Sequence, residues 1–300
     1  MQHWAVNEPY LDMHCSLGEG PHYEPSTNCL RFVDIRSRRL HSVNLSSGPS
    51  SLTSTEFTIP VSFTADIQGV DPSKTILVGG KSGVYLLDRR SGELQLLKSF
   101  HTATVDEKRA SRLSCNDGAV DSNGQLWLGT MTDFDLGPPK AEGCLYFIDS
   151  KLCIIAKRKS LIVPNGIGWA PDHNTLYFIH PSDRQVLAFT TSGSGDIQNE
   201  RVLYQHDGEG EPDGLRVDIE GNLWIAIYGE GRVLKISPVG EIIGEVTYLT
   251  PLITCHVFIG SELGVTTADD EKSEFGGGIF KVDVGVEGME IYTFKLEVGI

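Results

Sequence analysis

The chain has 300 residues, of which 40% are hydrophobic and 22% charged, a globular composition with enough length to bury a large core. Asp and Glu number 40 against 25 Lys and Arg, and the resulting net charge of −15 repels nucleic acid phosphates and anionic membrane surfaces. We therefore expect neither nucleic acid nor a membrane as a partner, and no obligate protein partner is indicated.

The N-terminal segment and the cysteines bear on the compartment. Residues 1–12 carry acidic and polar groups where a signal peptide would need a basic and then an apolar region, and no run approaches eighteen apolar residues. The six cysteines are scattered without a Cys-x-x-Cys pair, so neither a cysteine zinc site nor a disulfide framework is predicted. We interpret the protein as cytoplasmic, with reduced thiols.

A repeated unit organises the chain from end to end. Each copy runs from a glycine through a short alternating strand, an Asp-containing turn and an apolar strand. The copies begin at glycines spaced 48 or 49 residues apart, Gly20, Gly69, Gly118, Gly166 and Gly214, and a degraded sixth copy covers residues 256–265. A third strand follows in each copy, at residues 41–45, 83–88, 144–149, 185–189, 231–236 and 278–283.

This repeat predicts the fold. Short strands bounded by turns such as Asn-Gly and Glu-Gly form antiparallel hairpins, and helical patterns are almost absent. About four strands per unit, six times over, predict an all-β, six-bladed β-propeller with four-stranded antiparallel blades, filling residues 1–300 as a single domain. A β-sandwich is the alternative, but sandwiches do not repeat so evenly. Residues 133–142 and 267–277 are predicted to be loops over one face of the disc, and either the segment near Val6 or residues 292–296 could close the ring.

The residues directly before the repeat glycines are all oxygen donors, namely Glu19, Gln68, Asp117, Asn165 and Asp213. Because the first strand of each propeller blade lines the central channel, we expect these side chains to converge. Three converging carboxylates are costly unless a cation neutralises them or some of them protonate. An oxygen-only set favours Ca²⁺, Mg²⁺ or Mn²⁺. The alternative is that each residue satisfies only its local turn.

Five segments together carry a family pattern. They are Leu-Gly-Glu-Gly-Pro-His-Tyr at 17–23, Asn-Asp-Gly-Ala-Val-Asp at 116–121, Pro-Asn-Gly-Ile-Gly-Trp at 164–169, Pro-Asp-Gly-Leu-Arg-Val at 212–217 and Gly-Gly-Gly-Ile-Phe-Lys-Val at 276–282. In this order and spacing they resemble the senescence marker protein/gluconolactonase/luciferin-regenerating enzyme family over nearly the whole chain. The resemblance implies a six-bladed propeller that hydrolyses a sugar lactone to its aldonic acid.

The same resemblance implies roles for individual residues. A glutamate, an asparagine and an aspartate bind the divalent ion in the family, and they correspond to Glu19, Asn165 and Asp213. We expect one divalent cation, Ca²⁺ before Mg²⁺, Mn²⁺ or Zn²⁺, to polarise the ester carbonyl while water attacks it. Asp213 is then the catalytic residue, both ligand and base. Asn116 is expected to contact a substrate hydroxyl or a metal-bound water, and Asp133 to hold ring hydroxyls.

The chain departs from the family pattern beside this site. Many lactonases of the family have a substrate-gripping arginine two residues before the asparagine that corresponds to Asn116, and here that position is Ser114. Arg112, two residues further back, is a candidate to reach in. Replacing a guanidinium by a hydroxyl changes which oxygen pattern can be bound, so Ser114 and Arg112 join the predicted substrate contacts. His180 replaces a usual aspartate; we interpret His180 and His256 as structural histidines in preference to an acid or base.

Three functions stay open at this point. The first is a metal-dependent lactone hydrolase. The second is a non-catalytic calcium- or metabolite-binding propeller, and the third is a propeller esterase acting on an organophosphate or a specialised metabolite. The chain has no Gly-x-Gly-x-x-Gly before a helix, no phosphate loop and no Gly-x-Ser-x-Gly elbow, so nucleotide use and serine-triad hydrolysis have no support.

Overall fold

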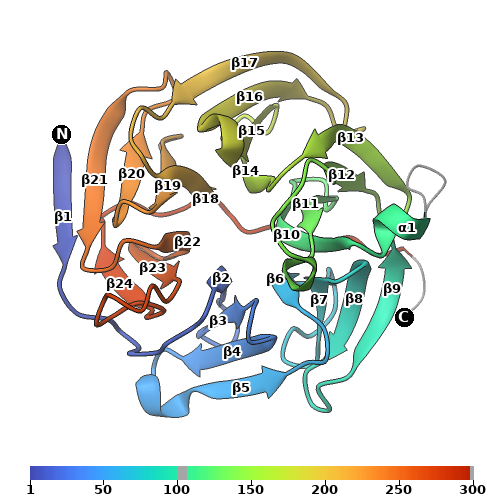
Figure 1. Ribbon diagram of the computed structural model, residues 1–300, viewed down its shortest axis with the longest axis horizontal. Coiled ribbons are helices and arrows are strands. Elements are labelled where there is room, and N and C mark those ends of the chain that lie inside the picture. The colour runs from blue at the N-terminus through green and yellow to red at the C-terminus, as the bar shows by residue number, and fades with distance from the viewer. Residues whose placement is uncertain (101–106, 298–300) are drawn as a thin grey trace.

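Six β-sheets surround a central channel in the computed structural model, which describes residues 1–100 and 107–297 (Figure 1). The predicted all-β, six-bladed propeller is confirmed. Helical structure within the described residues is limited to α1 (Glu107–Ala110) and the 3₁₀ turns η1 (Pro49–Ser51), η2 (Phe134–Leu136) and η3 (Pro181–Asp183). None of the helices in this part of the chain is long and apolar enough to cross a membrane.

Each blade begins at the channel and runs outward strand by strand (Figure 1). Blades 1 to 3 contain β2 (Gly18–Glu24), β3 (Cys29–Asp34), β4 (Arg39–Asn44) and β5 (Thr53–Glu56); β6 (Val61–Ala65), β7 (Thr75–Gly80), β8 (Gly83–Asp88) and β9 (Leu94–Ser99); and β10 (Leu113–Val120), β11 (Leu126–Thr132), β12 (Gly143–Ile148) and β13 (Ile154–Leu161). Blades 4 to 6 contain β14 (Asn165–Trp169), β15 (Thr175–His180), β16 (Gln185–Thr191) and β17 (Ile197–Gln205); β18 (Glu211–Val217), β19 (Leu223–Tyr228), β20 (Arg232–Ile236) and β21 (Ile242–Tyr248); and β22 (Ile253–Ile259), β23 (Glu262–Thr267) and β24 (Phe280–Asp283).

The Asp-containing turn of the repeat has a physical reason. Asp121 Oδ1 accepts hydrogen bonds from the backbone N–H groups of Asn123 and Gln125, at 2.9 and 3.0 Å, while its Oδ2 accepts from Trp127 Nε1 at 3.1 Å. Blade 5 repeats the arrangement with Asp218 and Trp224. One carboxylate thus closes the hairpin turn and satisfies the indole N–H that the blade core buries.

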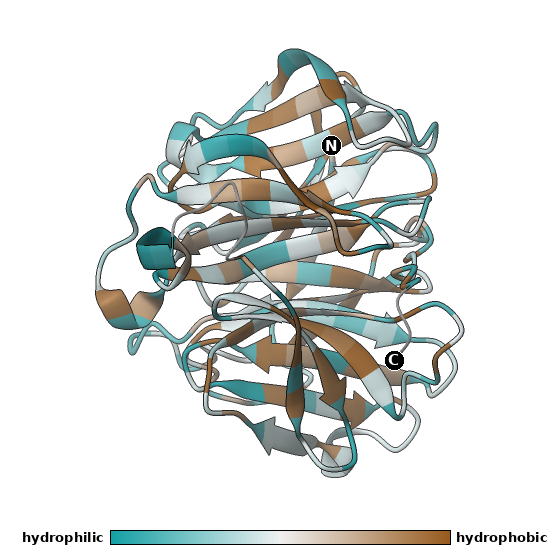
Figure 2. Ribbon diagram, turned by 90° about the vertical axis from the view of Figure 1, so that its right-hand side faces the viewer, coloured by the Kyte–Doolittle hydropathy of each residue, from teal (hydrophilic) through white to brown (hydrophobic). Residues whose placement is uncertain are grey.

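The core lies between the blades. Inner strands such as β12 and β19 are apolar and buried along nearly their whole length, because each sheet packs both of its faces on neighbouring blades. Figure 2 shows hydrophobic segments on strands throughout the disc. Trp127 and Trp224 are fully buried in this packing. These two tryptophans therefore support the blades and offer no exposed stacking surface.

The two chain ends do not share a blade. β1 (Gln2–Val6) adds to blade 5 as a fifth strand, parallel to β21, while blade 6 has three strands. Residues 287–297, which we call the C-terminal strap, instead run across the disc (Figure 1). Backbone hydrogen bonds join the strap to Val217 of blade 5, then to Asp66 and Gln68 of blade 2, and then to Gly124 and Ser150 of blade 3. Neither segment offered as a closing strand completes the last blade.

The two long loops lie at the channel end where the first strands begin. Residues 133–142 join the second to the third strand of blade 3, and residues 268–279 do the same in blade 6. Because first and second strands are antiparallel, these connections lie beside the starts of the first strands. The short β7–β8 turn of blade 2, which contains Lys81, lies at the same end. We call this end the upper mouth, and the strap crosses the opposite end.

Candidate functional site

Four buried oxygen donors lie near the starts of the first strands of four blades. Glu19 is on β2, Asp117 on β10, Asn165 on β14 and Asp213 on β18, and each residue is at most 9% exposed. The antiparallel ladder shifts its register beside each of them. Such bulges turn side chains out of the regular alternation and are common next to active sites. We call these four residues the donor ring.

The glycine that follows each donor allows neighbouring blades to approach closely. A Cβ atom on Gly20 would lie 2.7 Å from the carbonyl oxygen of Ser62, and one on Gly166 would lie 2.7 Å from that of Asp213. Gly20 also has a φ of 51°, which disfavours any side chain there. In each recurring pair, the acid or amide therefore places an oxygen donor at the channel, and the glycine allows the next blade to pack closely.

The carboxylates of the donor ring oppose one another's ionisation. Burial, followed by the charge of Asp117, raises the pKa of Glu19 to about 8. Burial and then the charges of Glu19 and Asp117 raise the pKa of Asp213 well above its ordinary value. Burial likewise raises the pKa of Asp117. These shifts show that the three carboxylates lie within electrostatic range of each other.

One cation partly offsets this charge from within the channel. Arg216, on the same strand as Asp213, lowers the pKa of both Glu19 and Asp117 against the effect of burial. If a bound cation keeps all three carboxylates ionised, they and the one guanidinium leave two negative charges at the ring. A divalent cation would neutralise that remainder.

The chemistry of the donor ring fits such a cation. Asp117 Oδ2 and Asp213 Oδ1 are buried without a hydrogen-bond partner, and carboxylate and amide oxygens are the ligands that Ca²⁺ and Mg²⁺ prefer. Among the described residues, no group of three or more His, Cys, Asp or Glu side chains could hold a metal ion by itself. Glu19, Asn165 and Asp213 therefore fit an open site, where water or substrate would supply further ligands.

Gln68 does not belong to the ring, and its inclusion was wrong. Blade 2 begins its first strand at Val61, with Ser62 packed against Gly20, whereas Gln68 follows the other end of that strand. Gln68 is exposed there, and its N–H donates to Phe294 O of the strap. The error came from Gly69, a turn glycine with a φ of 75° that matches the strand glycines in spacing only.

Two predicted substrate contacts lie on β10, close to Asp117. Asn116 is partly buried and its Nδ2 donates to Pro164 O at 3.1 Å, which leaves the side-chain oxygen available as an acceptor. Ser114 is 3% exposed, and its Oγ has no hydrogen-bond partner in the described structure. On blade 3, Asn116 thus keeps a free amide oxygen and Ser114 an unsatisfied buried hydroxyl.

The other two predicted contacts differ in their surroundings. The Arg112 guanidinium is held by the Glu142 carboxylate at 3.0 to 3.2 Å, and this pair occupies its fork. Asp133 is fully buried; its Oδ2 lies 2.9 Å from Lys81 Nζ, and its Oδ1 accepts from Asp135 N–H. Lys81 was not identified from the sequence. A lysine in a short turn carries no distinguishing motif, and only the packing of blade 2 on blade 3 brings it to Asp133.

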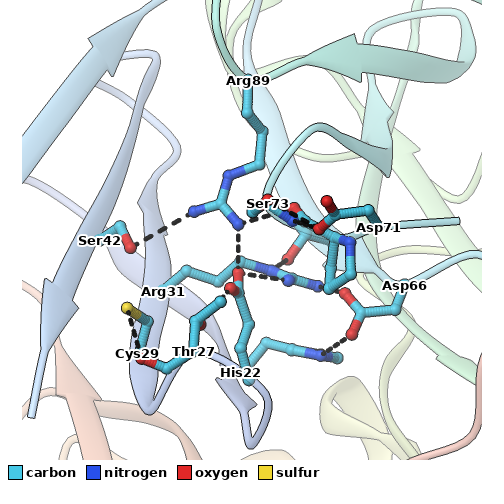
Figure 3. Close-up of polar contacts among 12 residues, drawn as sticks. His22, Thr27, Cys29, Arg31, Ser42, Asp66, Asp71, Ser73 and Arg89 are labelled. Atoms are coloured by element: carbon cyan, nitrogen blue, oxygen red, sulfur yellow. Dashed lines mark hydrogen bonds and ion pairs between the residues drawn. The ribbon is translucent and has the colours of Figure 1, made fainter.

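The histidines have structural surroundings. His180 Nδ1 lies 2.7 Å from Asp183 Oδ2, beyond the end of β15. His256 is fully buried, and burial lowers its pKa to about 3, which keeps it neutral. His22, three residues after Glu19, lies 3.5 Å from Asp66 Oδ2 in a buried polar cluster with Arg31 and Arg89 (Figure 3). Figure 3 shows this cluster joining blade 1 to blade 2.

The channel continues below the donor ring as a cavity of about 110 Å³. Asp117 and Arg216 line it on the side of the ring, and its walls include Phe63, Ile167 and Val257. Residues 289–292 of the strap line it as well, and the N–H of Met289 bonds to Val217 O at the lower end of β18. The strap therefore forms part of the cavity wall at the lower end of the channel.

The fold and site define a class: a six-bladed β-propeller with an acidic, oxygen-donor ring at one mouth of its channel. The family model described as the SMP-30/Gluconolactonase/LRE-like region matches residues 17–269, and the chain belongs to this family. Membership supports lactone hydrolysis as the general activity.

Related proteins match along almost their full length. Human (Homo sapiens) regucalcin is 32% identical over 311 residues, covering 96% of this chain and 97% of that protein. The solved structure of a luciferin-regenerating enzyme matches with a TM-score of 0.84 at 27% identity, covering 94% of this chain and 96% of the other. Regucalcin from Agrobacterium tumefaciens, described as a calcium-binding protein, has a TM-score of 0.85 at 24% identity, covering 99% and 100%, and shares the fold.

Proposed function

We propose that this protein is a divalent-metal-dependent hydrolase that opens a lactone, with Glu19, Asn165 and Asp213 as the metal ligands. The observation that carries the proposal is the set of buried carboxylate and amide oxygens from four blades at one mouth, with Asp117 Oδ2 and Asp213 Oδ1 unpartnered. Ca²⁺ is the first candidate, because regucalcin relatives include one described as calcium-binding. Mg²⁺, Mn²⁺ and Zn²⁺ are the alternatives. Every proposed ligand comes from one chain, so no partner is needed.

A bound divalent cation would polarise the ester carbonyl and stabilise the developing oxyanion. Asp213 accepts the proton of the attacking water while the water oxygen bonds to the carbonyl carbon. The acyl–oxygen bond of the ring then breaks, and the proton passes to the leaving alkoxide, which yields the hydroxy acid. The Asn165 side chain, which interacts with Asp213, holds that carboxylate in position. Asn116 accepts a hydrogen bond from a substrate hydroxyl through its free side-chain oxygen.

The test is a pH-indicator hydrolysis assay on aldonolactones and aliphatic lactones. Chelator-stripped protein receives Ca²⁺, Mg²⁺, Mn²⁺ or Zn²⁺ in turn, beside the near-isosteric variant Asp213→Asn. We expect turnover that requires metal and falls by at least about a hundredfold in the variant, as for loss of a positioned general base. Asp207→Asn, an exposed aspartate on the same approach to β18, is the matched control and should keep full activity.

A second candidate is a calcium-binding propeller without turnover. It is favoured by Ser114, which stands where the lactonases of the family pattern have a substrate-gripping arginine. Calorimetric Ca²⁺ binding that depends on Glu19 and Asp213, combined with no hydrolysis of any lactone by any metal-loaded form, would replace the hydrolase proposal by this one.

A further inference from the structure

The cavity below the donor ring, which we call the lower cavity, has mostly apolar walls and a charged upper end. Its volume is about 110 Å³, and its walls include Phe63, Ile167 and Val257. Asp117 and Arg216 line it on the side of the ring. An engineered apolar cavity of about 150 Å³ binds benzene, so the lower cavity has room for a ring of about five carbon atoms.

Arg216 brings hydrogen-bond donors to this cavity. It lies on β18, the innermost strand of blade 5, and its charge acts on Glu19 and Asp117. The residue is still only half-buried, and because β18 is enclosed by the disc, its accessible surface faces the channel. Leu215 O accepts from Nη1 at 2.7 Å, and the Cys255 thiol also interacts with the guanidinium. A guanidinium has five N–H donors, so these two partners leave donors for a ligand.

The charges at the upper end favour a neutral ligand. Glu19, Asp117 and Asp213 place three carboxyl groups at the ring, against the one guanidinium of Arg216. An anion in the lower cavity would be repelled by the ionised carboxylates and would lose its hydration to apolar walls. A carbonyl oxygen accepts a hydrogen bond from a guanidinium without adding a charge. The surroundings therefore fit a small cyclic ketone or a similar neutral carbonyl compound.

The strap closes the lower cavity with a segment that is held only at its ends (Figure 1). Residues 289–292 line the lower cavity and also a second hollow of about 300 Å³, so they form a wall between the two. At one end the Met289 N–H donates to Val217 O at 2.9 Å, and at the other the Phe294 N–H donates to Asp66 O at 2.8 Å. Between these two bonds, no backbone bond joins this described segment to the disc. A local displacement here would open the cavity without unfolding a blade.

We propose that the lower cavity is a second ligand site, which binds a small neutral carbonyl compound with an apolar ring. The carbonyl oxygen accepts a hydrogen bond from Arg216, and the ring packs on Phe63, Ile167 and Val257. The strap segment 289–292 covers the ligand from below. Binding requires neither a metal ion nor turnover, so the inference stands apart from the proposed function.

Two of the four methionines report where a ligand binds. In protein with ¹³C-labelled methionine methyl groups, Met289 reports on the lower cavity, whereas Met131, which pairs with Ser114, reports on the upper mouth. The probe is cyclopentanone, a small apolar ring with one carbonyl. We expect a saturable shift of the Met289 NMR signal, with a Kd on the order of 1 mM for a ligand of this size, and no shift of Met131.

Two variants test the contacts. Ala119 is half-buried on β10 and lines the lower cavity, so Ala119→Leu should reduce the room and weaken cyclopentanone binding at least about tenfold. Ala5→Leu, at an exposed position of β1, is the matched control and should bind like wild type. Arg216→Met should weaken cyclopentanone binding at least about tenfold, as for loss of a hydrogen bond to a charged group, but leave methylcyclopentane binding within about threefold.

Several results would overturn the inference. A shift of Met131 without one of Met289 would place the ligand at the upper mouth, and no shift of Met289 at about ten times the expected Kd would leave the lower cavity to water. Equal losses for cyclopentanone and methylcyclopentane in Arg216→Met, or tighter binding of cyclopentanecarboxylate than of cyclopentanone, would refute the assigned ligand class. Should Ala119→Leu not fold, the Met289 titration of wild type and the comparison of the three ligands still decide.

Discussion

Replacing Arg31 by methionine is expected to destabilise the propeller strongly, because the buried Arg31 side chain joins the buried Glu24 carboxylate of blade 1 to the half-buried Asp66 carboxylate of blade 2. Its side chain is fully buried, with Nη1 2.6 Å from Glu24 Oε1, Nη2 2.7 Å from Asp66 Oδ1 and Nε 2.7 Å from Thr64 Oγ1. Burial alone would raise the pKa of Glu24, yet Arg31 and Arg89 hold it below its ordinary value. In Arg31→Met, Glu24 keeps Arg89 and the Thr27 hydroxyl, and Asp66 keeps His22.

The expected loss follows from the cost of leaving a buried charge without its partner, about 3–5 kcal/mol of the free energy of unfolding. For a chain of 300 residues the entropy of unfolding is about 0.6 kcal/mol/K, so the Tm should fall by about 5–8 °C. The assay is urea unfolding followed by fluorescence, with calorimetry for the Tm.

Arg39→Met is the matched control for this variant. Arg39 pairs with Glu56 at 3.1 Å in the same blade, but the two side chains are 48% and 70% exposed, and exposed pairs contribute about 0–1 kcal/mol. A loss below about 1 kcal/mol in Arg31→Met, or equal losses in both variants, would refute the argument that the cluster of Figure 3 holds blades 1 and 2 together.

Four further results are expected. Burial alone would raise the pKa of Glu230, but hydrogen bonds from Gly210, His206 and Arg232 lower it from an ordinary 4.5 to about 2. The ionised Glu230 therefore stabilises the fold above pH 4.5, and this stabilisation is lost as the pH falls through 2. Acid unfolding followed by circular dichroism should show a shallower loss of stability in that window for Glu230→Gln than for wild type. Among the cysteines, only Cys153 is exposed, and a thiol reagent should label it first in the native protein, as peptide mass spectrometry would show. Phe294→Ala, at a fully buried position of the strap, should cost about 3–5 kcal/mol in urea unfolding. With free Ca²⁺ at a hundred times the Kd of the proposed site, chelating the Ca²⁺ should lower the free energy of unfolding by about 2.7 kcal/mol. The Tm should fall accordingly, and added Ca²⁺ should restore it.

The repeat made the fold and most of the donor ring predictable. A glycine that must admit the neighbouring backbone and a donor that must point into the channel recur together, so Glu19, Asn165 and Asp213 are visible in the sequence. The same rule, a donor directly before a repeat glycine, wrongly included Gln68, because the sequence does not distinguish a turn glycine such as Gly69 from a strand glycine.

Contacts made across the seams between blades left no trace in the sequence pattern. Lys81 and Asp133 are 52 positions apart and meet only after blades 2 and 3 pack together. The parallel pairing of β1 with β21 is equally hidden, since an isolated strand of five residues carries no information about which sheet edge will accept it. Local periodicity therefore predicted the strands of each blade, but not the side-chain and strand pairings between segments that are far apart in the sequence.

The strap supplies backbone bonds to blades that are not neighbours in the ring. All six sheets are complete once β24 has emerged from the ribosome, but the backbone bonds that tie blade 5 to blades 2 and 3 come from residues 287–297. At the other end, residues 1–17 run from blade 5 past blade 6, where Leu11 pairs with Ile279, to blade 1. Residues 1–17 and residues 287–297 thus fasten blades that are otherwise complete. A nascent chain that stops at residue 286 would hold every blade and the N-terminal fastening, but would lack the bonds that tie blade 5 to blades 2 and 3.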